Sequence, residues 1–319
     1  MIKMALIPAI YATIEISKVM VTPMFLGFFI ASIIRSSTYF RYLSLPTSHL
    51  VSVANLPTEC SAALTLFLMN NWAALAMLSE LHKNKTINDN ELIVAVLIGF
   101  IPKGFHSTIF FSVPVAVSVL GLHAGGLYVC LDILANLFVA IVGIFIGKLI
   151  LIHRKSPINH ETDQVTADRL ITRVKNSLKD SIHSSIRIIK ILIPTIFLAQ
   201  LAIDYILVLP IVEKYNSIMI PFGIPSSSLI VLFASLVSQN AALVAGGTLL
   251  NSGDISVKNC LLLLFMARFL HLGVGFLRIG IPANLSYFGG SIGLKVTLIE
   301  YSLIEIANVI IIAILIVNW

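Results

Sequence analysis

The chain has 319 residues, of which 58 % are hydrophobic and 11 % are charged, and its mean hydropathy is +0.98. Soluble globular domains carry roughly 45–50 % apolar and about 25 % charged residues, so this composition excludes a surface that water wets. The net charge of +6 comes without interleaved aromatic and basic residues, which argues against a nucleic-acid partner. We therefore expect an integral membrane protein whose main partner is the lipid bilayer.

Two long stretches, 60–79 and 220–250, contain no Lys, Arg, Asp or Glu. Apolar runs longer than about 18 residues are typical of membrane-spanning helices, whereas barrel strands are alternating segments of about 10 residues. The pattern predicts an all-α, polytopic helical protein of the cell membrane. Cys60, Cys130 and Cys260 form no CxxC pair, so we expect no disulfide framework, metal site or cofactor.

Four helices are expected in the first part of the chain, at about 10–34, 57–80, 90–120 and 125–150. Pro57 marks the start of the second helix, and a short polar turn follows it, in which Thr86 is the expected N-cap of the third helix. The third helix is too long for one simple span. Pro102 and Gly104 are expected to break it.

A polar, basic segment at 153–185 interrupts the apolar runs. Its second half has apolar residues four apart, which is the spacing of a helical stripe. It is either a solvated connector or a helix that lies on the cytoplasmic surface with basic residues toward anionic lipid.

Four more helices are expected after this linker, at about 184–209, 225–250, 257–288 and 293–317. Asp254 is the expected N-cap of the third of them. Breaks in that third helix are expected at Gly273, Gly275 and Gly280.

The two halves match without a gap when the chain is shifted by 168 residues. Proline, glycine and acidic positions coincide at this one offset, which chance matches among Leu and Ile do not explain. The matched pairs are Pro57 and Pro225, Pro114 and Pro282, Gly121 and Gly289, Gly125 and Gly293, and Asp132 and Glu300. We therefore predict two tandem repeats, at 1–152 and 186–319, joined by a cytoplasmic linker at 153–185.

The number of crossings stays open at about eight to ten. Four crossings in each repeat place the linker and the loop with Lys83 and Lys85 on the cytoplasmic side, as the positive-inside rule favours. If the overlong third helix is two half-spans, each repeat has five segments. An odd number of crossings would invert the second repeat relative to the first.

The start of each second helix is the strongest candidate for a binding site. A proline followed by small polar residues leaves free backbone N–H groups at a helix N-terminus, and transporters use such interrupted helices to hold polar solutes. The alternative is an ordinary helix cap at the membrane interface. The candidate residues are Pro57, Glu59 and Cys60 in the first repeat and Pro225, Ser226 and Ser228 in the second.

Polar side chains also lie deep inside the second helices. Because unsatisfied polar groups in hydrocarbon cost several kcal/mol, these side chains are expected to face protein or water. They either line a solute pathway or hold helices together by hydrogen bonds. They are Asn70 and Asn71 in one repeat and Ser238, Gln239 and Asn240 in the other.

Ionisable side chains within predicted spans complete the candidate set, because intramembrane charges are rare and usually functional. Lys103 and His106 flank Gly104, and Arg268 and His271 lie near the equivalent break. Their alternative role is to reach the interface with their long side chains. Asp132 and Glu300 are too short for that. They are expected to hold a cation, to couple protons, or to neutralise Lys103 and His271.

No catalytic constellation is present, since the sequence lacks a P-loop, a GxSxG motif and a zinc-binding helix motif. We therefore do not expect an enzyme.

The run 92–150, with Ile101-Pro102-Lys103-Gly104-Phe105-His106 in its first third, resembles a Gate domain, also called a nucleoside-recognition domain. Such domains occur in pairs in the membrane half of the ferrous-iron transporter B family, in spore-maturation membrane proteins, and in compact archaeal and bacterial proteins. Two Gate-like units cover nearly all of this chain. The iron transporters carry a cysteine just before the glycine that corresponds to Gly104, where this chain has Lys103, and Ser228 takes the place of Cys60 in the second unit.

The sequence thus predicts a transporter or permease for an unknown small solute or ion, with its pathway between the two repeats. The alternative, which the spore-maturation resemblance implies, is a structural or assembly protein of the membrane. A homo-oligomer or a partner membrane protein fits both interpretations.

Overall fold

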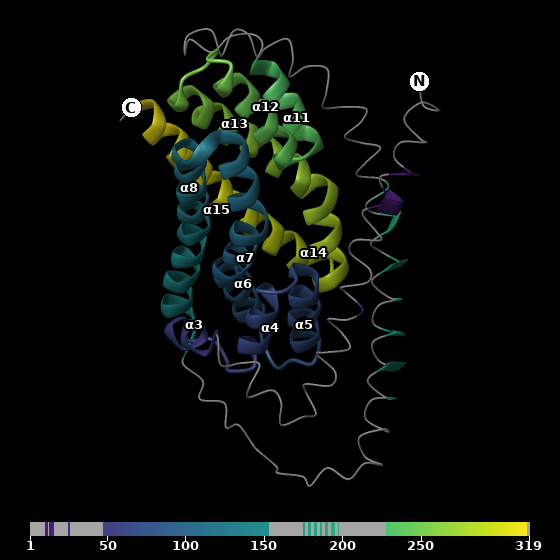
Figure 1. Cartoon of the computed structure of the whole chain (residues 1–319). Helices are drawn as coiled ribbons and strands as arrows, with labels where there is room; N and C mark the ends of the chain where they lie inside the picture. Colours follow the sequence, from purple (N-terminus) through teal and green to yellow (C-terminus); the bar gives the residue numbers. More distant parts are fainter. Residues whose placement is uncertain are drawn as a thin grey trace.

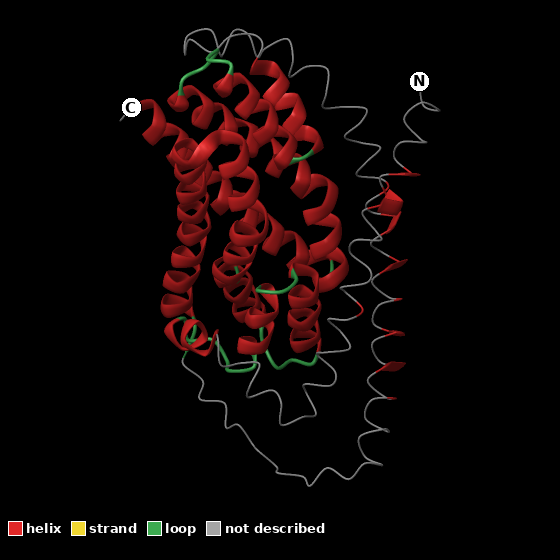
Figure 2. Cartoon of the chain, viewed as in Figure 1, coloured by secondary structure: helices red, strands yellow, loops and turns green. Residues whose placement is uncertain are grey.

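The computed structural model describes residues 47–152 and 228–317, together with isolated residues between 10 and 25 and between 175 and 197. Helices account for the regular structure of this part of the chain, and no strand occurs in it (Figure 2). The all-α prediction is confirmed for these residues. The predicted first helix of each repeat and the linker at 153–185 lie largely outside them.

The first repeat contains six helices and one π-helical turn within the described stretch (Figure 1). Their bounds are α3 (Ser48–Val53), α4 (Cys60–Phe67), α5 (Asn71–Lys83), α6 (Asp89–Ile98), α7 (Phe100–Ser107), the π-helical turn η2 (Thr108–Ser112) and α8 (Val113–Ile150).

The second repeat contains the same order of elements from its hairpin onward. Their bounds are α11 (Leu229–Val237), α12 (Gln239–Asn251), α13 (Val257–Gly275), the π-helical turn η5 (Phe276–Gly280), α14 (Ile281–Phe288) and α15 (Gly290–Val317). Equivalent positions in the two repeats differ by 168 in residue number. This holds for the two π-helical turns, for both ends of α5 and α12, and for the starts of α6 and α13. The offset read from the sequence is therefore also the offset between equivalent structural elements.

Each predicted second helix is in fact a hairpin of two short helices, so the prediction of single spans at 57–80 and 225–250 is wrong. α4 and α5 lie side by side at one end of the body, and α11 and α12 lie side by side at the other (Figure 1). The chain leaves the helical conformation at Asn70 (φ −159°, ψ 122°) and at Ser238 (φ −163°, ψ 152°). The longer arm has 13 residues, or about 20 Å, which is too short to cross a hydrocarbon core of about 30 Å.

The third predicted helix runs on past the expected breaks. Pro102 and Gly104 lie inside α7, and Gly273 and Gly275 lie inside α13. In the first repeat the helix is interrupted at Gly99, between α6 and α7, and both repeats contain a π-helical turn that does not end the helix. The expected break at Gly280 coincides with the last residue of η5.

α8 is interrupted at Gly121, as α14 and α15 are separated at Gly289, so that residues 113–120 belong to the third helix and the rest of α8 is the fourth. These two glycines make the reversal between the third and fourth helices, and their φ angles are +78° and +88°. L-residues with a side chain rarely adopt this conformation, which explains why glycine occurs at both positions. One turn later, a Cβ on Gly125 would lie 2.5 Å from the Ala116 carbonyl oxygen. A Cβ on Gly293 would lie similarly close to the carbonyl of Asn284. Steric crowding therefore explains why glycine occurs at both positions.

The caps of the third helices differ from the predicted residues. Asn88, and not Thr86, caps α6 in a reciprocal capping box with Glu91. Ser256, and not Asp254, caps α13 by accepting a hydrogen bond from the Asn259 N–H. Both caps lie two residues later than expected and again differ by 168.

The repeats are related by an approximate two-fold axis. Ser79 of α5 donates a hydrogen bond to the carbonyl oxygen of Tyr287 in α14, and at the equivalent place Gly247 of α12 packs on Val119 of α8. Residues 79 and 247, and 119 and 287, each differ by 168, so the contact is reciprocal, as at a two-fold interface. Figure 1 shows α8 and α15 running in opposite directions, with the α5–α6 turn and the α12–α13 turn at opposite ends.

Three described helical segments are long and apolar enough to cross a membrane: Val115–Ile150, Val257–Phe288 and Gly290–Val317. Large apolar side chains on α8 and α15 are exposed, among them Leu122 (81 %), Leu149 (69 %) and Val317 (78 %). Lipid tails are the medium in which such a surface is stable. The prediction of a membrane protein is confirmed at this level.

Candidate functional site

A buried ion pair joins the two repeats at their centre. Arg268 of α13 donates from Nη1 to Oδ1 of Asp132 in α8, and both side chains are about nine-tenths buried. Two further side chains donate hydrogen bonds to the Asp132 carboxylate: Ser112 through Oγ at 3.2 Å and Asn136 through Nδ2 at 3.3 Å. A carboxylate removed from water needs such donors, and three side chains supply them here.

A second ion pair occupies the equivalent position of the other repeat. Lys103 Nζ of α7 lies 3.3 Å from Oε1 of Glu300 in α15, and the Lys103 side chain is 35 % exposed. Asn284 donates to Oε2 of Glu300 at 3.4 Å and to the Thr297 hydroxyl at 3.0 Å. This pair is better solvated than the Asp132 pair.

The two pairs exchange partners between the repeats. The acidic residue on the fourth helix of each repeat binds a basic residue from the third helix of the other repeat. The basic positions differ by one turn, since Lys103 corresponds to His271 and Arg268 corresponds to Phe100 at the offset of 168. The expected neutralisation of Lys103 by an acidic residue is observed, whereas Asp132 pairs with Arg268 in place of His271. Any relative movement of the repeats would have to stretch or exchange these pairs.

The hairpin tips hold the predicted amides, and their first role is capping. Asn70 Oδ1 accepts hydrogen bonds from the N–H groups of Trp72 and Ala73, and Ser238 Oγ accepts one from Ala241. At the second tip Gln239 Nε2 also donates to the Tyr128 hydroxyl at 3.0 Å.

Tyr128 lies about one turn before Asp132 on α8, so this contact places the second hairpin tip beside the Asp132 pair. Asn71 and Asn240 adjoin the tips, and Asn71 is half-buried while Asn240 is exposed.

The two candidate histidines lie on the helices that supply the basic residues. His271 Nδ1 is 2.6 Å from the carbonyl oxygen of Ser235 in α11, which ties α13 to the second hairpin. His106 is half-buried in α7, one turn after Lys103.

The proline-marked start of the first hairpin lies away from the ion pairs. The preceding turn packs on the C-terminal end of α8, because Ala54 contacts Gly147 and Asn55 donates to the Leu151 carbonyl. Gly147 is 15 residues beyond Asp132, or roughly 22 Å along the helix.

Pro57 and Cys60 are buried and Glu59 is partly buried at this end of the body. Ser228, at the start of the second hairpin, is buried, whereas Pro225 and Ser226 lie outside the described residues.

Sequence reasoning missed a further buried acid on α15, Glu305, and its neighbour Asn308. It also missed the donors Ser112, Asn136 and Asn284, whose equivalents in the other repeat are Gly280, Ile304 and Ala116. Because their equivalents are not polar, a comparison of the two repeats does not single these residues out. Helical spacing offers the one available signal, since Glu305 and Asn308 lie three apart in an otherwise apolar run.

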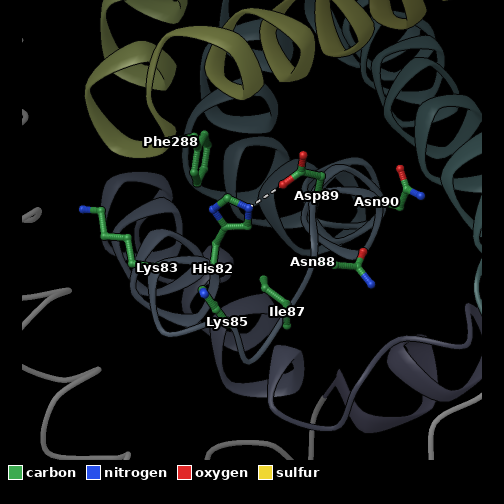
Figure 3. A pocket seen from close by; sticks show the side chains of 8 residues that line it. All are labelled: His82, Lys83, Lys85, Ile87, Asn88, Asp89, Asn90 and Phe288. Atoms are coloured by element: carbon green, nitrogen blue, oxygen red, sulfur yellow. Dashed lines mark hydrogen bonds and ion pairs between the residues drawn. The ribbon is translucent and has the colours of Figure 1, made fainter.

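Among the hollows in the described part of the chain are two that none of the four side chains in the cross-repeat ion pairs lines. A cavity of about 220 Å³ between α7 and α8 is lined mainly by apolar side chains, with Thr108 and Asn136 as its polar groups. A wider pocket of about 730 Å³ opens at the α5–α6 turn, where His82 and Asp89 form a 2.7 Å ion pair beside Phe288 (Figure 3). In the described part of the chain, no group of three or more His, Cys, Asp or Glu residues could hold a metal ion.

Comparisons with known proteins extend over both repeats. No family model and no solved structure matches the chain. It is 26 % identical over 299 residues to Uncharacterized protein MJ0880 of Methanocaldococcus jannaschii, covering 91 % of this chain and 94 % of that protein. It is 27 % identical over 308 residues to Uncharacterized protein MJ0871 of the same organism, covering 95 % and 93 %. These relatives have nearly the same length and match it almost from end to end.

Proposed function

We propose that this protein is a transporter or permease for a small solute or ion, with its pathway between the two repeats. The observation that carries the proposal is the pair of ion bridges that cross from repeat to repeat, Asp132–Arg268 and Lys103–Glu300. Buried charges are costly and are retained where they serve a pathway or a switch. The wall of the pathway would combine them with His106, His271 and the hairpin tips.

The arrangement of the repeats supports this function. Secondary transporters are commonly built from repeats related by a two-fold axis in the membrane plane, with sites at discontinuous helices near the midplane. Here α4–α5 and α11–α12 start from opposite ends of the body, and each hairpin packs on the other repeat. Non-helical backbone at membrane depth is tolerated where protein covers it or where it lines a cavity.

The proposed topology has ten membrane-embedded segments, at the upper end of the predicted eight to ten. Each repeat would contribute its first helix, the two arms of its hairpin, and its third and fourth helices. Because a hairpin returns to its own side, three segments per repeat cross fully and the second repeat is inverted. The end with the basic α5–α6 turn, which carries Lys83 and Lys85, would face the cytoplasm of a cell membrane.

With no P-loop in the sequence, active transport would use an ion gradient or a partner membrane protein, and a homo-oligomer is compatible with the lipid-facing surface. No catalytic residue is proposed. In a structural or assembly role, the same ion pairs would lock the repeats together.

Uptake into proteoliposomes tests the proposal. The full chain is reconstituted, and entry of a panel of nucleosides and divalent ions is measured for wild type, Glu300→Gln and a control, Asp254→Asn, in the exposed α12–α13 turn. We expect saturable uptake of at least one solute, reduced at least tenfold by Glu300→Gln and unchanged by Asp254→Asn. Absence of uptake for every solute would favour the structural role, and equal uptake by both variants would remove Glu300 from the mechanism.

A further inference from the structure

Two buried acceptor oxygens on α15 lack a hydrogen-bond donor. Glu305 is 6 % exposed and Asn308 is fully buried, and Asn308 Nδ2 donates to Oε2 of Glu305 at 3.0 Å. Neither Oε1 of Glu305 nor Oδ1 of Asn308 has a partner. Buried polar atoms in native proteins are almost always paired, so two orphan acceptors on neighbouring side chains indicate a missing positive species.

A proton meets this need better than a metal ion. Protonation of Oε1 gives Glu305 a hydroxyl that donates a hydrogen bond, and it removes the charge of the carboxylate in the same step. Hard divalent cations require six or more oxygen ligands, usually with several carboxylates. Around the described residues no cluster of three acidic, histidine or cysteine side chains exists to supply them.

The balance of buried charge gives the same answer. Three acidic residues are buried on the fourth helices α8 and α15, namely Asp132, Glu300 and Glu305, and two basic side chains, Arg268 and Lys103, form ion pairs there. Glu91 of α6 is buried as well, but its carboxylate accepts a hydrogen bond from the Asn88 N–H in the capping box. The ion pairs neutralise Asp132 and Glu300, which leaves the Glu305 carboxylate in excess. An isolated buried charge takes up a proton when the protein cannot supply a counter-ion.

The surroundings of Glu305 connect it to the repeat interface. Arg268, which binds Asp132, also interacts electrostatically with Glu305, as does Tyr301 on its own helix. Other titratable or charged groups also lie on α15 and on the elements that pack against it. They are His123, Tyr128, Cys130, Asp132 and Lys148 of α8, Lys258, Cys260 and His271 of α13, Arg278 of η5, Tyr287 of α14, Asp89 and Glu91 of α6 and, on α15 itself, Lys295 and Glu300. Arg268 therefore interacts with two carboxylates, by direct contact with Asp132 and at longer range with Glu305.

We propose that Glu305, with Asn308 as its hydrogen-bond partner, is a buried proton-binding site that is coupled through Arg268 to the Asp132 ion pair. Protonated Glu305 leaves Arg268 to Asp132 alone, whereas ionised Glu305 competes for the guanidinium and weakens the contact between the repeats. The inference relies on the proposed function only in assigning the proton a role in transport.

The site has no counterpart at the equivalent position of the first repeat. The equivalents of Glu305 and Asn308 in the first repeat are Leu137 and Ala140, which cannot bind a proton. Glu305 thus adds a titrating group to one repeat alone, beside a framework of ion pairs that both repeats share.

Infrared difference spectroscopy tests the site without a solute. The full chain in lipid nanodiscs is stepped from alkaline to acidic pH, and the carbonyl band of protonated carboxyl groups is recorded. We expect a band from a water-shielded carboxyl in wild type, its loss in Glu305→Gln, and a shift in its frequency in Asn308→Val, because the amide no longer donates to the acid. Asp254→Asn, which removes an exposed carboxyl, should leave the band unchanged.

Three outcomes would overturn the site: a full band in Glu305→Gln, an unchanged frequency in Asn308→Val, or suppression of the wild-type band by sodium, which would mean that a metal ion occupies it. Gel filtration and the thermal midpoint check that Glu305→Gln is folded, and Asn308→Val keeps the test valid if it is not. The spectroscopic experiment contains no solute, so its result does not depend on whether the protein transports anything. A missing carboxyl band would contradict the proton site and not the proposed transport, and missing uptake would contradict transport and not the proton site.

Discussion

At the scale of single residues, the two ion pairs are equivalent by symmetry but not in energy. Asp132 and Arg268 are both about nine-tenths buried, whereas Lys103 keeps a third of its side chain exposed. Breaking a buried pair leaves an uncompensated charge, which costs about 3–5 kcal/mol, while an exposed pair contributes about 0–1 kcal/mol. Solvent access to Lys103 therefore makes its pair the easier one to open.

Arg268→Gln should consequently lower the free energy of unfolding by about 3 kcal/mol or more, and Lys103→Gln by about 1 kcal/mol. The larger loss has a clear physical reason, since Asp132 then remains charged and buried with only Ser112 and Asn136 as donors. Unfolding in mixed detergent micelles, followed by circular dichroism, measures both values.

The double variant Asp132→Asn with Arg268→Gln serves as the control, because it removes both charges together. It should be more stable than Arg268→Gln alone. Equal losses for Arg268→Gln and Lys103→Gln would show that burial does not distinguish the two pairs.

The charged residues show which parts of the site could be predicted from the sequence. Asp132 and Glu300 were predictable because both copies of the repeat retain an acid at one register. Glu305 was not, since its equivalent is Leu137 and a comparison of the halves discards unmatched residues. The basic partners of Asp132 and Glu300 were not predictable either. Each partner comes from the other repeat, and the two basic positions differ by one helical turn.

At the scale of elements, the hairpins account for the main error of the sequence interpretation. The run 60–79 is free of charge and reads as one span, because hydropathy alone does not register a reversal that two polar caps make possible. Asn70 and Ser238 were identified as buried polar residues, but a cap and a pathway residue have the same appearance in sequence. The matched glycines predicted the structure more reliably. Where the backbone of one helix touches the next, any side chain larger than hydrogen would clash.

The glycines after each reversal provide a matched test. Gly125→Ala places a methyl group against the Ala116 carbonyl, while the neighbouring Gly126 has nothing within 4 Å of an added Cβ. We expect Gly125→Ala to destabilise the protein by about 1–3 kcal/mol through overpacking, and Gly126→Ala to be neutral or to stabilise α8 by up to about 1 kcal/mol.

Thermal unfolding of both variants in one detergent gives the comparison. The second repeat supplies an independent copy of the test, because Gly293 is blocked by Asn284 and Gly290 is open. If alanine were accepted equally at Gly125 and Gly126, the close packing of the reversal on α8 would be wrong.

At the scale of the whole molecule, the reciprocal contacts Ser79–Tyr287 and Gly247–Val119 fix the two repeats around one axis. This axis lies across the long helices and not along them, since α8 and α15 run in opposite directions (Figure 1). The proposed inverted topology places equivalent turns of such a body on opposite sides of the membrane. The sequence left parallel and inverted repeats open because the count of crossings depended on the hairpins.

Cysteine labelling separates the two topologies. Thr86→Cys and Asp254→Cys occupy equivalent exposed positions in the turns after the hairpins, 168 residues apart. They are introduced singly into a background with Cys130→Ser, because Cys60 and Cys260 are buried and Cys130 is exposed. In right-side-out vesicles, a membrane-impermeant maleimide should label Asp254→Cys, and Thr86→Cys should react only after the vesicles are opened.

His123→Cys gives the internal reference for that experiment. It lies just after Gly121, in the reversal whose residue Val119 contacts Gly247, so it should label from the same side as Asp254→Cys although it belongs to the same repeat as Thr86. Labelling of Thr86→Cys and Asp254→Cys from one side would require parallel repeats. The cross-repeat ion pairs could not then form as described, because α8 and α15 would have to run in the same direction.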